Sequence, residues 1–336
     1  MPSRPDPKET EAVLMGGEAR YTRDEVVRLA GTSPEFAARI WRALGFAARE
    51  DDVPAYTDSD VEAMRVTARL IRDGLLTEEA SIRLARAMGQ TMIRLAEWQT
   101  SILTTLSYKP EVDTDGHLGP LVGLAKELLP DMETLLLHVW RRQLVAAVSR
   151  SLAVQEQQSE DASPHYFPLI VGFADLVSFT TLSRELDEVA LADVVEGFEA
   201  TSADIVASCG GRIVKTLGDE ILYVADDARS AADIALQLAA GVKTHVEVPD
   251  VRVGVAYGPV LALLGDVFGT TVNRASRLTS FARPGTVLID EALAAQLKDE
   301  EGFQVVAVRA RHAHGLGQLQ PYALRRSFGS AAAARG

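Results

Sequence analysis

The chain has 336 residues, with 34 lysines and arginines against 47 aspartates and glutamates, and a formal net charge of −13. This length is enough for two domains of ordinary size. The acidic balance disfavours non-specific binding to DNA or to an anionic membrane, and the single cysteine, Cys209, excludes internal disulfide bonds and cysteine-based zinc sites.

The N-terminal residues lack the apolar core of a secretion signal. No later stretch is apolar over the roughly 18 residues that are needed to cross a bilayer. The sequence therefore predicts a cytoplasmic protein without a membrane partner.

Helical patterning dominates residues 1–154, where apolar residues recur at spacings of three and four. Ser59 with Glu62 predicts a capping box, and Pro34 after Ser33 is typical of a first helical turn. These residues are predicted to form an all-helical domain. Its expected helices are Thr22–Ala30, Pro34–Leu44, Ser59–Arg72, Glu78–Leu106 and Asp131–Val154.

Residues 21–46 resemble the helix-turn-helix start of MerR-type regulators, which raises DNA binding as one interpretation. Against it, residues 1–165 contain 26 acidic and 19 basic side chains, and the second helix offers only Arg39 and Arg42. We therefore favour helix packing over base reading. In that interpretation the core or interface residues are Phe36, Trp41 and Leu44.

Residues 155–165 are polar and contain a proline, which is typical of a linker. Strands and helices then alternate over residues 166–328, and residues 329–336 are predicted to be a disordered tail. The order strand, helix, two strands, helix, strand is ferredoxin-like, so we expect an α+β chain. The expected elements are Phe167–Phe173, Leu182–Ala207, Arg212–Thr216, Ile221–Ala225, Arg229–Val242, Val251–Tyr257, Val272–Phe281, Thr286–Ile289, Phe303–Val308 and Tyr322–Arg325.

Two aspartates lie at points that this fold brings together. Asp175 follows the first expected strand, and Asp219 forms, with Gly218, the turn of the expected hairpin. Two convergent carboxylates can hold a pair of divalent cations against a triphosphate. Taken singly, each aspartate is equally well explained as a turn or cap residue.

Three motifs surround these aspartates and follow them: Phe-Ala-Asp-Leu-Val-Ser-Phe-Thr at residues 173–180, Arg-Ile-Val-Lys-Thr-Leu-Gly-Asp-Glu at residues 212–220, and Asp-Val-Phe-Gly-Thr-Thr-Val-Asn-Arg-Ala-Ser-Arg at residues 266–277. In this order and spacing, the motifs closely resemble the catalytic domain of the class III nucleotidyl cyclases. The resemblance implies that Asp175, Asp219 and the backbone oxygen of Leu176 bind two divalent cations, Mg²⁺ or Mn²⁺. In this family, one ion activates the ribose 3′-hydroxyl and the other binds the phosphates.

Lys215 and Asp266 are, taken alone, an ordinary strand-edge lysine and a loop aspartate. Adenine presents an acceptor at ring nitrogen 1 and a donor at its 6-amino group, which a lysine and a carboxylate match. In the class III family, these two residue types mark adenylate cyclases, whereas glutamate with cysteine or a similar residue marks guanylate cyclases. The pair therefore favours ATP.

Asn273 and Arg277 are four residues apart on an expected helix and so share one face. Their ordinary interpretation is a solvent-facing turn. The resemblance implies that Asn273 contacts the ribose and that Arg277 stabilises the pentavalent phosphorus of the transition state. Phosphate contacts are implied for the turn at Phe179 and Thr180 and for Arg252, which could also form a strand-edge ion pair.

His314 precedes Gly-Leu-Gly where many relatives carry a phosphate-binding lysine before Gly-x-Gly. A histidine with an ordinary pKa is charged only below about pH 6.5, so substrate binding through it would be favoured by acid. An exposed loop residue is the alternative.

The resemblance implies a head-to-tail homodimer, because the metal ligands and the residues that contact the base and the transition state face opposite sides of one domain. The whole chain resembles soluble actinobacterial adenylate cyclases with an all-helical regulatory domain, which in some members is autoinhibitory and pH-responsive. His117 and His138 are candidate proton sensors, and a small hydrophobic ligand between the helices is a further candidate.

The sequence thus predicts an adenylate cyclase, a phosphorus-oxygen lyase that converts ATP to 3′,5′-cyclic AMP and pyrophosphate. Two alternatives stay open: a DNA-binding or nucleotide-sensing regulator with a degenerate cyclase domain, and a guanylate cyclase. A P-loop ATPase is excluded because the Gly-x-x-x-x-Gly-Lys-Ser/Thr motif is absent from the sequence.

Overall fold

The computed structural model describes residues 7–47, 52–107, 118–157, 166–241 and 249–327. The chain divides into two compact units, Met1–Arg150 and Ser151–Gly336. The expected tail at residues 329–336 and most of the expected linker lie outside the described ranges. Within those ranges, no helix is long and apolar enough to cross a membrane.

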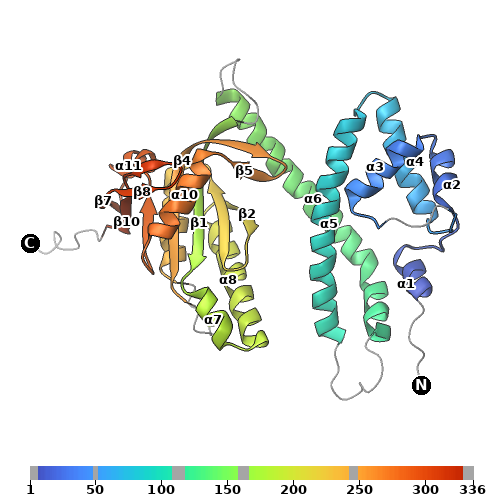
Figure 1. The fold of residues 1–336 in the computed structure, drawn as a ribbon, viewed down its shortest axis with the longest axis horizontal. Coiled ribbons are helices and arrows are strands. Elements are labelled where there is room, and N and C mark those ends of the chain that lie inside the picture. The colour runs from blue at the N-terminus through green and yellow to red at the C-terminus, as the bar shows by residue number, and fades with distance from the viewer. Residues whose placement is uncertain (1–6, 48–51, 108–117, 158–165, 242–248, 328–336) are drawn as a thin grey trace, which may run out of the picture. The chain divides into compact units, whose positions relative to one another are not determined.

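The first unit is built from helices, as its periodicity predicts (Figure 1). A small core joins its short helices: Val26, Phe36, Trp41 and Met64 are buried in one cluster, and Leu44 packs against that cluster at its edge. Phe36 and Trp41 are therefore interior residues, as expected. The helices are α1 Pro7–Leu14, α2 Arg23–Ala30, α3 Pro34–Leu44, α4 Asp58–Arg72, α5 Glu78–Ser107 and α6 Leu118–Gln157, of which α1 was not expected.

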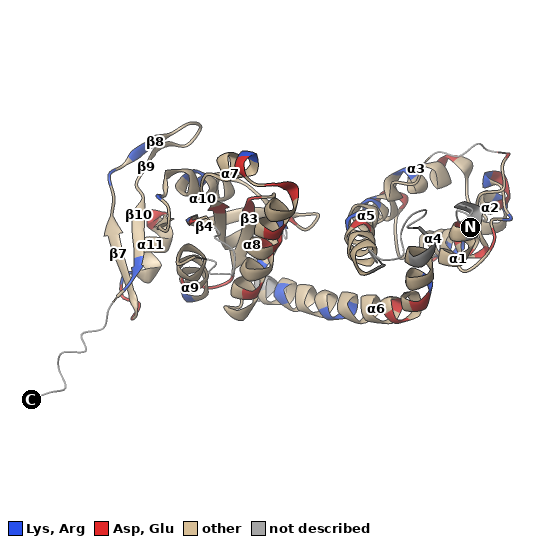
Figure 2. Cartoon of the chain, turned by 90° about the horizontal axis from the view of Figure 1, so that it is seen from below, with Lys and Arg blue, Asp and Glu red and all other residues tan. Residues whose placement is uncertain are grey.

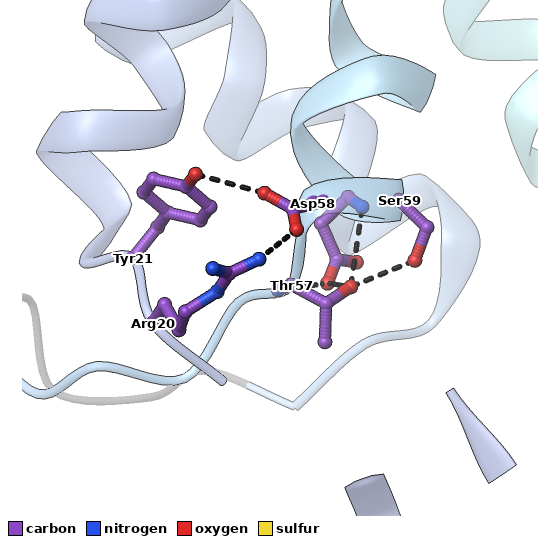
Figure 3. Close-up of polar contacts among 6 residues, drawn as sticks. Arg20, Tyr21, Thr57, Asp58 and Ser59 are labelled. Atoms are coloured by element: carbon purple, nitrogen blue, oxygen red, sulfur yellow. Dashed lines mark hydrogen bonds and ion pairs between the residues drawn. The ribbon is translucent and has the colours of Figure 1, made fainter. Parts of the chain in front are cut away.

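The capping box of α4 differs from the one that we expected. Thr57, and not Ser59, is the N-cap residue, and Asp60, and not Glu62, completes the box (Figure 3). The backbone N–H of Thr57 donates to Asp60 at 2.7 Å, and the backbone N–H of Asp60 donates to the Thr57 hydroxyl at 3.4 Å. The sequence offers both pairs at the same spacing, and the side chain that is buried, Thr57, is the one that caps.

The helix that we expected to start at Asp131 starts thirteen residues earlier, at Leu118, and runs through Pro130. A proline inside a helix removes one backbone hydrogen bond and crowds the preceding turn. In a helix of 40 residues, the remaining bonds tolerate that loss. Residues 155–157, which we assigned to the linker, are the last residues of α6.

The second unit is a mixed sheet in the order β2-β3-β1-β4-β6-β10-β7, with β5 paired to β4 and a separate two-stranded sheet, β8-β9. β1 pairs antiparallel with β3 and β4, which gives the ferredoxin-like core that the sequence predicts, and β4 pairs parallel with β6. The strands are β1 Tyr166–Leu176, β2 Arg212–Thr216, β3 Glu220–Ala225, β4 Val251–Leu263, β5 Asp266–Phe268, β6 Val287–Ile289, β7 Phe303–Ala307, β8 Arg311–Ala313, β9 Gly317–Leu319 and β10 Tyr322–Arg326.

Helices cover both faces of this sheet (Figure 1). On one face, Ile170 and Val253 are buried with side chains of α8 Glu188–Ser208, α9 Ala228–Ala239 and α11 Glu291–Leu297. On the other face, Val171 and Phe173 are buried with Ala275 and Leu278 of α10 Thr270–Phe281. Alternate residues of β1 thus serve two cores, which is why its sequence reads as a nearly continuous apolar run.

The single helix expected over Leu182–Ala207 is in fact two helices, α7 Phe179–Glu185 and α8. Leu186 is extended, and the Asp187 carboxylate accepts from the backbone N–H of Ala190 at 2.8 Å, so a new helix starts there. The apolar periodicity continues across the break, and only Asp187 signals it. The short strands β5, β8 and β9 and the helix α11 were not expected either.

Candidate active site

Asp175 and Asp219 converge where the end of β1 meets the β2-β3 turn. The backbone N–H of Leu176, the last residue of β1, donates to the carbonyl of Asp219 at 2.9 Å. The β2-β3 turn that carries Asp219 is closed by a bond from the Leu217 N–H to the Glu220 carbonyl at 2.7 Å, with Gly218 at a φ of 75°. The left-handed conformation suits a glycine, so the local sequence fixes this turn.

Three charged side chains lie in a row across the sheet. Asp175 is the register partner of Glu220 on β3 and of Arg252 on β4, so all three side chains share one face. The Arg252 Nε donates to Asp175 Oδ2 at 2.6 Å. Arg252, a predicted phosphate ligand, is therefore ion-paired with a predicted metal ligand.

Burial raises the pKa of Asp175, Arg252 opposes that shift, and Asp219 adds to it. Burial also raises the pKa of Glu220 to about 7, with Asp175 and Asp219 acting in the same direction. We did not predict a role for Glu220. Its signal was its place directly after Asp219, at the first position of a strand that pairs with β1.

This donor set fits a hard divalent cation. The charge of Asp219 disfavours ionisation of Asp175, and Asp175 and Asp219 both disfavour ionisation of Glu220, a repulsion that a bound cation would relieve. Among the residues that the structure describes, no three acidic, histidine or cysteine side chains form a ready metal cluster. A cation at Asp175 and Asp219 would therefore also need backbone, water or phosphate oxygens, as magnesium sites at triphosphates commonly do.

Lys215 and Asp266 are in contact although they are 51 residues apart. The Lys215 Nζ lies 2.5 Å from Asp266 Oδ2, with side-chain exposures of 34% and 26%. A register irregularity between Ile213 and Lys215 marks this part of β2, and the Val267 N–H fixes the other Asp266 oxygen at 2.8 Å. The structure thus places a hydrogen-bond donor, Lys215, next to an acceptor, Asp266, and both side chains are partly exposed.

Asn273 and Arg277 lie on one exposed face of α10, as their spacing predicts. Over the described residues, neither forms a hydrogen bond or an ion pair with Asp175, Asp219 or Lys215.

Phe179 and Thr180 are the first residues of α7, and not a turn as we expected. Their N-cap, Ser178, has a φ of 61° and makes no side-chain capping bond, and its carbonyl accepts from the Thr181 N–H at 2.9 Å. His314 lies in the exposed turn between β8 and β9, and within the described part of the chain it bonds to none of the other candidates. His138 is exposed on α6, and His117 lies outside the described residues.

Comparison with known proteins gives consistent results. Residues 163–326 match the family described as adenylate and guanylate cyclase catalytic domain. An adenylate cyclase of Streptomyces coelicolor is 48% identical over 290 residues, which is 85% of this chain and 74% of that protein. An adenylate cyclase of Glutamicibacter nicotianae is 40% identical over 331 residues, 95% of this chain and 82% of that protein.

Two more distant matches extend the comparison. A pH-sensitive adenylate cyclase of Mycobacterium tuberculosis is 28% identical over 322 residues, 93% of this chain and 80% of that protein. The crystal structure of the catalytic core of a rhodopsin-guanylyl cyclase with converted specificity, in complex with ATPαS, is 27% identical, with a TM-score of 0.45, and covers 48% of this chain and 98% of that one.

Proposed function

Because this chain belongs to the class III family of adenylate and guanylate cyclases, and is an enzyme of that family, we propose that it converts ATP to 3′,5′-cyclic AMP and pyrophosphate. The observation that carries this proposal is the convergence of Asp175 and Asp219, where a 2.9 Å backbone bond ties the end of β1 to the β2-β3 turn. We infer that this convergence forms a cation site, with Phe179 and Thr180 following Asp175 closely in the chain.

Cyclase domains of this family use divalent metal ions, and the chemistry that such ions supply is activation of the 3′-hydroxyl and neutralisation of phosphate charge. In our proposal, Asp175, Asp219 and the Leu176 backbone oxygen hold two of them, Mg²⁺ or Mn²⁺. Arg252, the N–H groups at Phe179 and Thr180, and His314 then contact the phosphates.

The base and the transition state are assigned to the remaining residues. Lys215 donates to ring nitrogen 1 of adenine, and Asp266 accepts from its 6-amino group. Asn273 orients the ribose, and Arg277 stabilises charge that develops on the phosphoryl oxygens. The contact between Lys215 and Asp266 within one chain supports their joint use by one base.

We propose that the active form is a homodimer, with each site taking its metal ligands from one chain and Lys215, Asp266, Asn273 and Arg277 from the other. Exposed apolar residues on the long helices support self-association: Trp98 is 62% exposed on α5, and Trp140 and Val145 are 55% and 62% exposed on α6. Between Arg142 and Arg150, α6 carries no charged residue (Figure 2). Surfaces of this kind are typical of interfaces.

Residues 1–154 are proposed to regulate residues 166–328. The match to a pH-sensitive relative covers 93% of this chain, which makes protons the first stimulus to test, ahead of a small hydrophobic ligand. The exposed His138 on α6 is a candidate sensor. Comparing cyclic AMP production by the full chain and by residues 160–336 between pH 5 and 8 tests this regulation. An autoinhibitory domain predicts a faster truncated form, with the two rates converging at one end of that range; parallel profiles would contradict pH control.

The reaction itself is tested by incubating the full chain with ATP, or with GTP in parallel, and Mn²⁺ or Mg²⁺, and identifying the products. Cyclic AMP in equal amount to pyrophosphate is expected. Cyclic GMP as the dominant product would instead make the protein a guanylate cyclase, and the absence of both cyclic nucleotides would refute the cyclase proposal.

A further inference from the structure

A buried carboxylate joins three elements of the second unit. Asp290, which is 3% exposed, is the N-cap residue of α11, and its Oδ1 accepts from the backbone N–H of Leu293 at 3.0 Å and of Tyr257, on β4, at 3.2 Å. The backbone N–H of Asp290 donates to Val255 on the same strand at 3.1 Å. These bonds hold Asp290 rigidly against the centre of the sheet.

The other oxygen of Asp290 is bound by α10. The Nη1 atom of Arg274 donates to Asp290 Oδ2 at 2.6 Å. Arg274 directly follows Asn273 and lies three residues before Arg277, so it borders the face that those two residues share. Of the two arginines on α10, Arg274 forms an ion pair within the described residues and Arg277 forms none.

Two hydroxyl groups and an apolar face also join α10 to the sheet. Thr271 donates to the Pro259 carbonyl at 2.8 Å and Thr279 to the Phe173 carbonyl at 3.4 Å, and Ala275 and Leu278 are buried against the sheet. Apolar packing is non-directional and fixes the distance of a helix from a sheet better than its rotation. Of these three side-chain bonds, the one from Arg274 is charge-assisted and the shortest, at 2.6 Å, so it contributes most to fixing that rotation.

We propose that Arg274 and Asp290 are positioning residues for the cyclisation: their ion pair sets the rotation of α10 and thereby the direction in which Asn273 and Arg277 leave it. This inference rests on the proposed function, because those two residues act in that reaction. Neither Arg274 nor Asp290 touches the substrate in this account. Because Asn273 and Arg277 are needed in the transition state, the loss should fall on kcat more than on the KM for ATP.

The test replaces Arg274 by Met, which keeps most of the length of the side chain and removes the charge, in the full chain and again in an Arg277→Ala background. We expect Arg274→Met alone to lower kcat by about tenfold or more with the KM within about threefold. In the Arg277→Ala background, the same substitution should cost less than it does alone, because only Asn273 is then left to be positioned and residues that act through one another are not additive. A general loss of folded protein would instead reduce activity equally in both backgrounds.

Arg283→Met is the matched control, since Arg283 follows α10, is exposed and forms no ion pair among the described residues. The variant Arg274→Lys keeps a positive charge that can reach Asp290, so it should retain more activity than Arg274→Met. This second variant keeps the test informative if Arg274→Met folds poorly. Wild-type activity in Arg274→Met, or an equal loss in both backgrounds, would overturn the inference. Wild-type protein that makes no cyclic AMP would overturn the proposed function instead.

Discussion

Asp175 lies between a positively and a negatively charged residue: Arg252 on β4 and Glu220 on β3. Its position in the row explains why the same aspartate can orient an arginine and serve a cation. Arg252 neutralises it in the arrangement seen here, at an Nε to Oδ2 distance of 2.6 Å. An arginine that pairs with a partly buried carboxylate, as Arg252 does with Asp175, can also contact a phosphate placed beside that carboxylate.

The choice between ATP and GTP can be tested by changing Lys215 and Asp266. Replacing Lys215 by Glu and Asp266 by Cys together removes the donor and acceptor pair that suits adenine and supplies the types that mark guanylate cyclases. ATP turnover should fall by about 100-fold or more, and GTP turnover should rise, because a polar pocket rejects a base that leaves its groups unpaired. Initial rates with each nucleotide give the ratio.

The control for that change is Lys298→Glu, which repeats the Lys→Glu replacement of position 215 at an exposed lysine at the C-terminal end of α11. It should leave the ratio of ATP to GTP turnover unaltered. If the double variant keeps the wild-type ratio, Lys215 and Asp266 do not read the base.

Sequence reasoning placed the individual candidates well where a turn or a helix fixes them. Asp219 was found because Gly218 predicts its turn, and Asn273 with Arg277 because a spacing of four predicts one helix face. Glu220 was missed because its effect depends on a cross-strand neighbour 45 positions earlier in the chain. For the same reason, the sequence left two interpretations of Arg252, a phosphate contact and a strand-edge ion pair. Its pairing with Asp175 depends on the register between β1 and β4.

At the scale of single elements, α4 offers a direct test of which residue caps it. The Thr57 hydroxyl accepts from the backbone N–H of Asp60. Within the described residues, the exposed Ser59 side chain bonds to the Thr57 hydroxyl alone, at 2.7 Å (Figure 3). Thr57→Ala should destabilise the first unit by about 1 kcal/mol, and Ser59→Ala should cost less than about half of that. Chemical denaturation of the two variants measures the difference, and an equal or reversed order would contradict Thr57 as the cap.

The contact between α10 and β4 depends on Gly254. A Cβ atom there would lie 2.1 Å from the backbone nitrogen of Thr279 and 2.5 Å from the carbonyl of Ala275, and backbone atoms cannot yield as a flexible side chain can. Gly254→Ala should therefore destabilise the second unit by about 3 kcal/mol and reduce catalysis, since it displaces the helix that carries Asn273.

Gly123→Ala serves as a comparison for Gly254→Ala. This helical glycine on α6 has no atom within 4 Å of an added Cβ, so its replacement should leave stability unchanged or raise it by up to about 1 kcal/mol. Urea denaturation followed by circular dichroism measures both variants. A stable and fully active Gly254→Ala protein would show that α10 is free to move away from β4.

Most of the periodic helices of the first unit were predicted within a few residues, whereas the start of α6, before Pro130, and the short or interrupted elements were not. The Leu182–Ala207 prediction merged two helices because apolar spacing continues across Leu186. Strands of three residues, such as β5, β8 and β9, are too short to show a period. Tertiary pairing, and not local sequence, makes them strands.

The proposed sharing of each site between two chains leads to a complementation test. Asp175→Ala chains and Asn273→Ala chains should each be inactive alone. If sites are shared between two chains, an equal mixture should recover up to about a quarter of wild-type activity, because half of the dimers are mixed and each of these has one complete site. A mixture that stays inactive, although the chains are shown to exchange, would place each site within one chain.

Adenylate cyclase activity through Asp175 and Asp219 is tested most directly by measuring cyclic AMP formation from ATP with Mn²⁺. The full chain is compared with its Asp175→Asn and Asp219→Asn variants. Wild-type protein should release cyclic AMP and pyrophosphate in equal amounts, and each variant should be slower by about 100-fold or more, because the cation site loses a charged ligand. Asp226→Asn, at an exposed aspartate just after β3, should behave as wild type. Wild-type protein without product, or variants that keep its rate, would contradict an adenylate cyclase that works through Asp175 and Asp219.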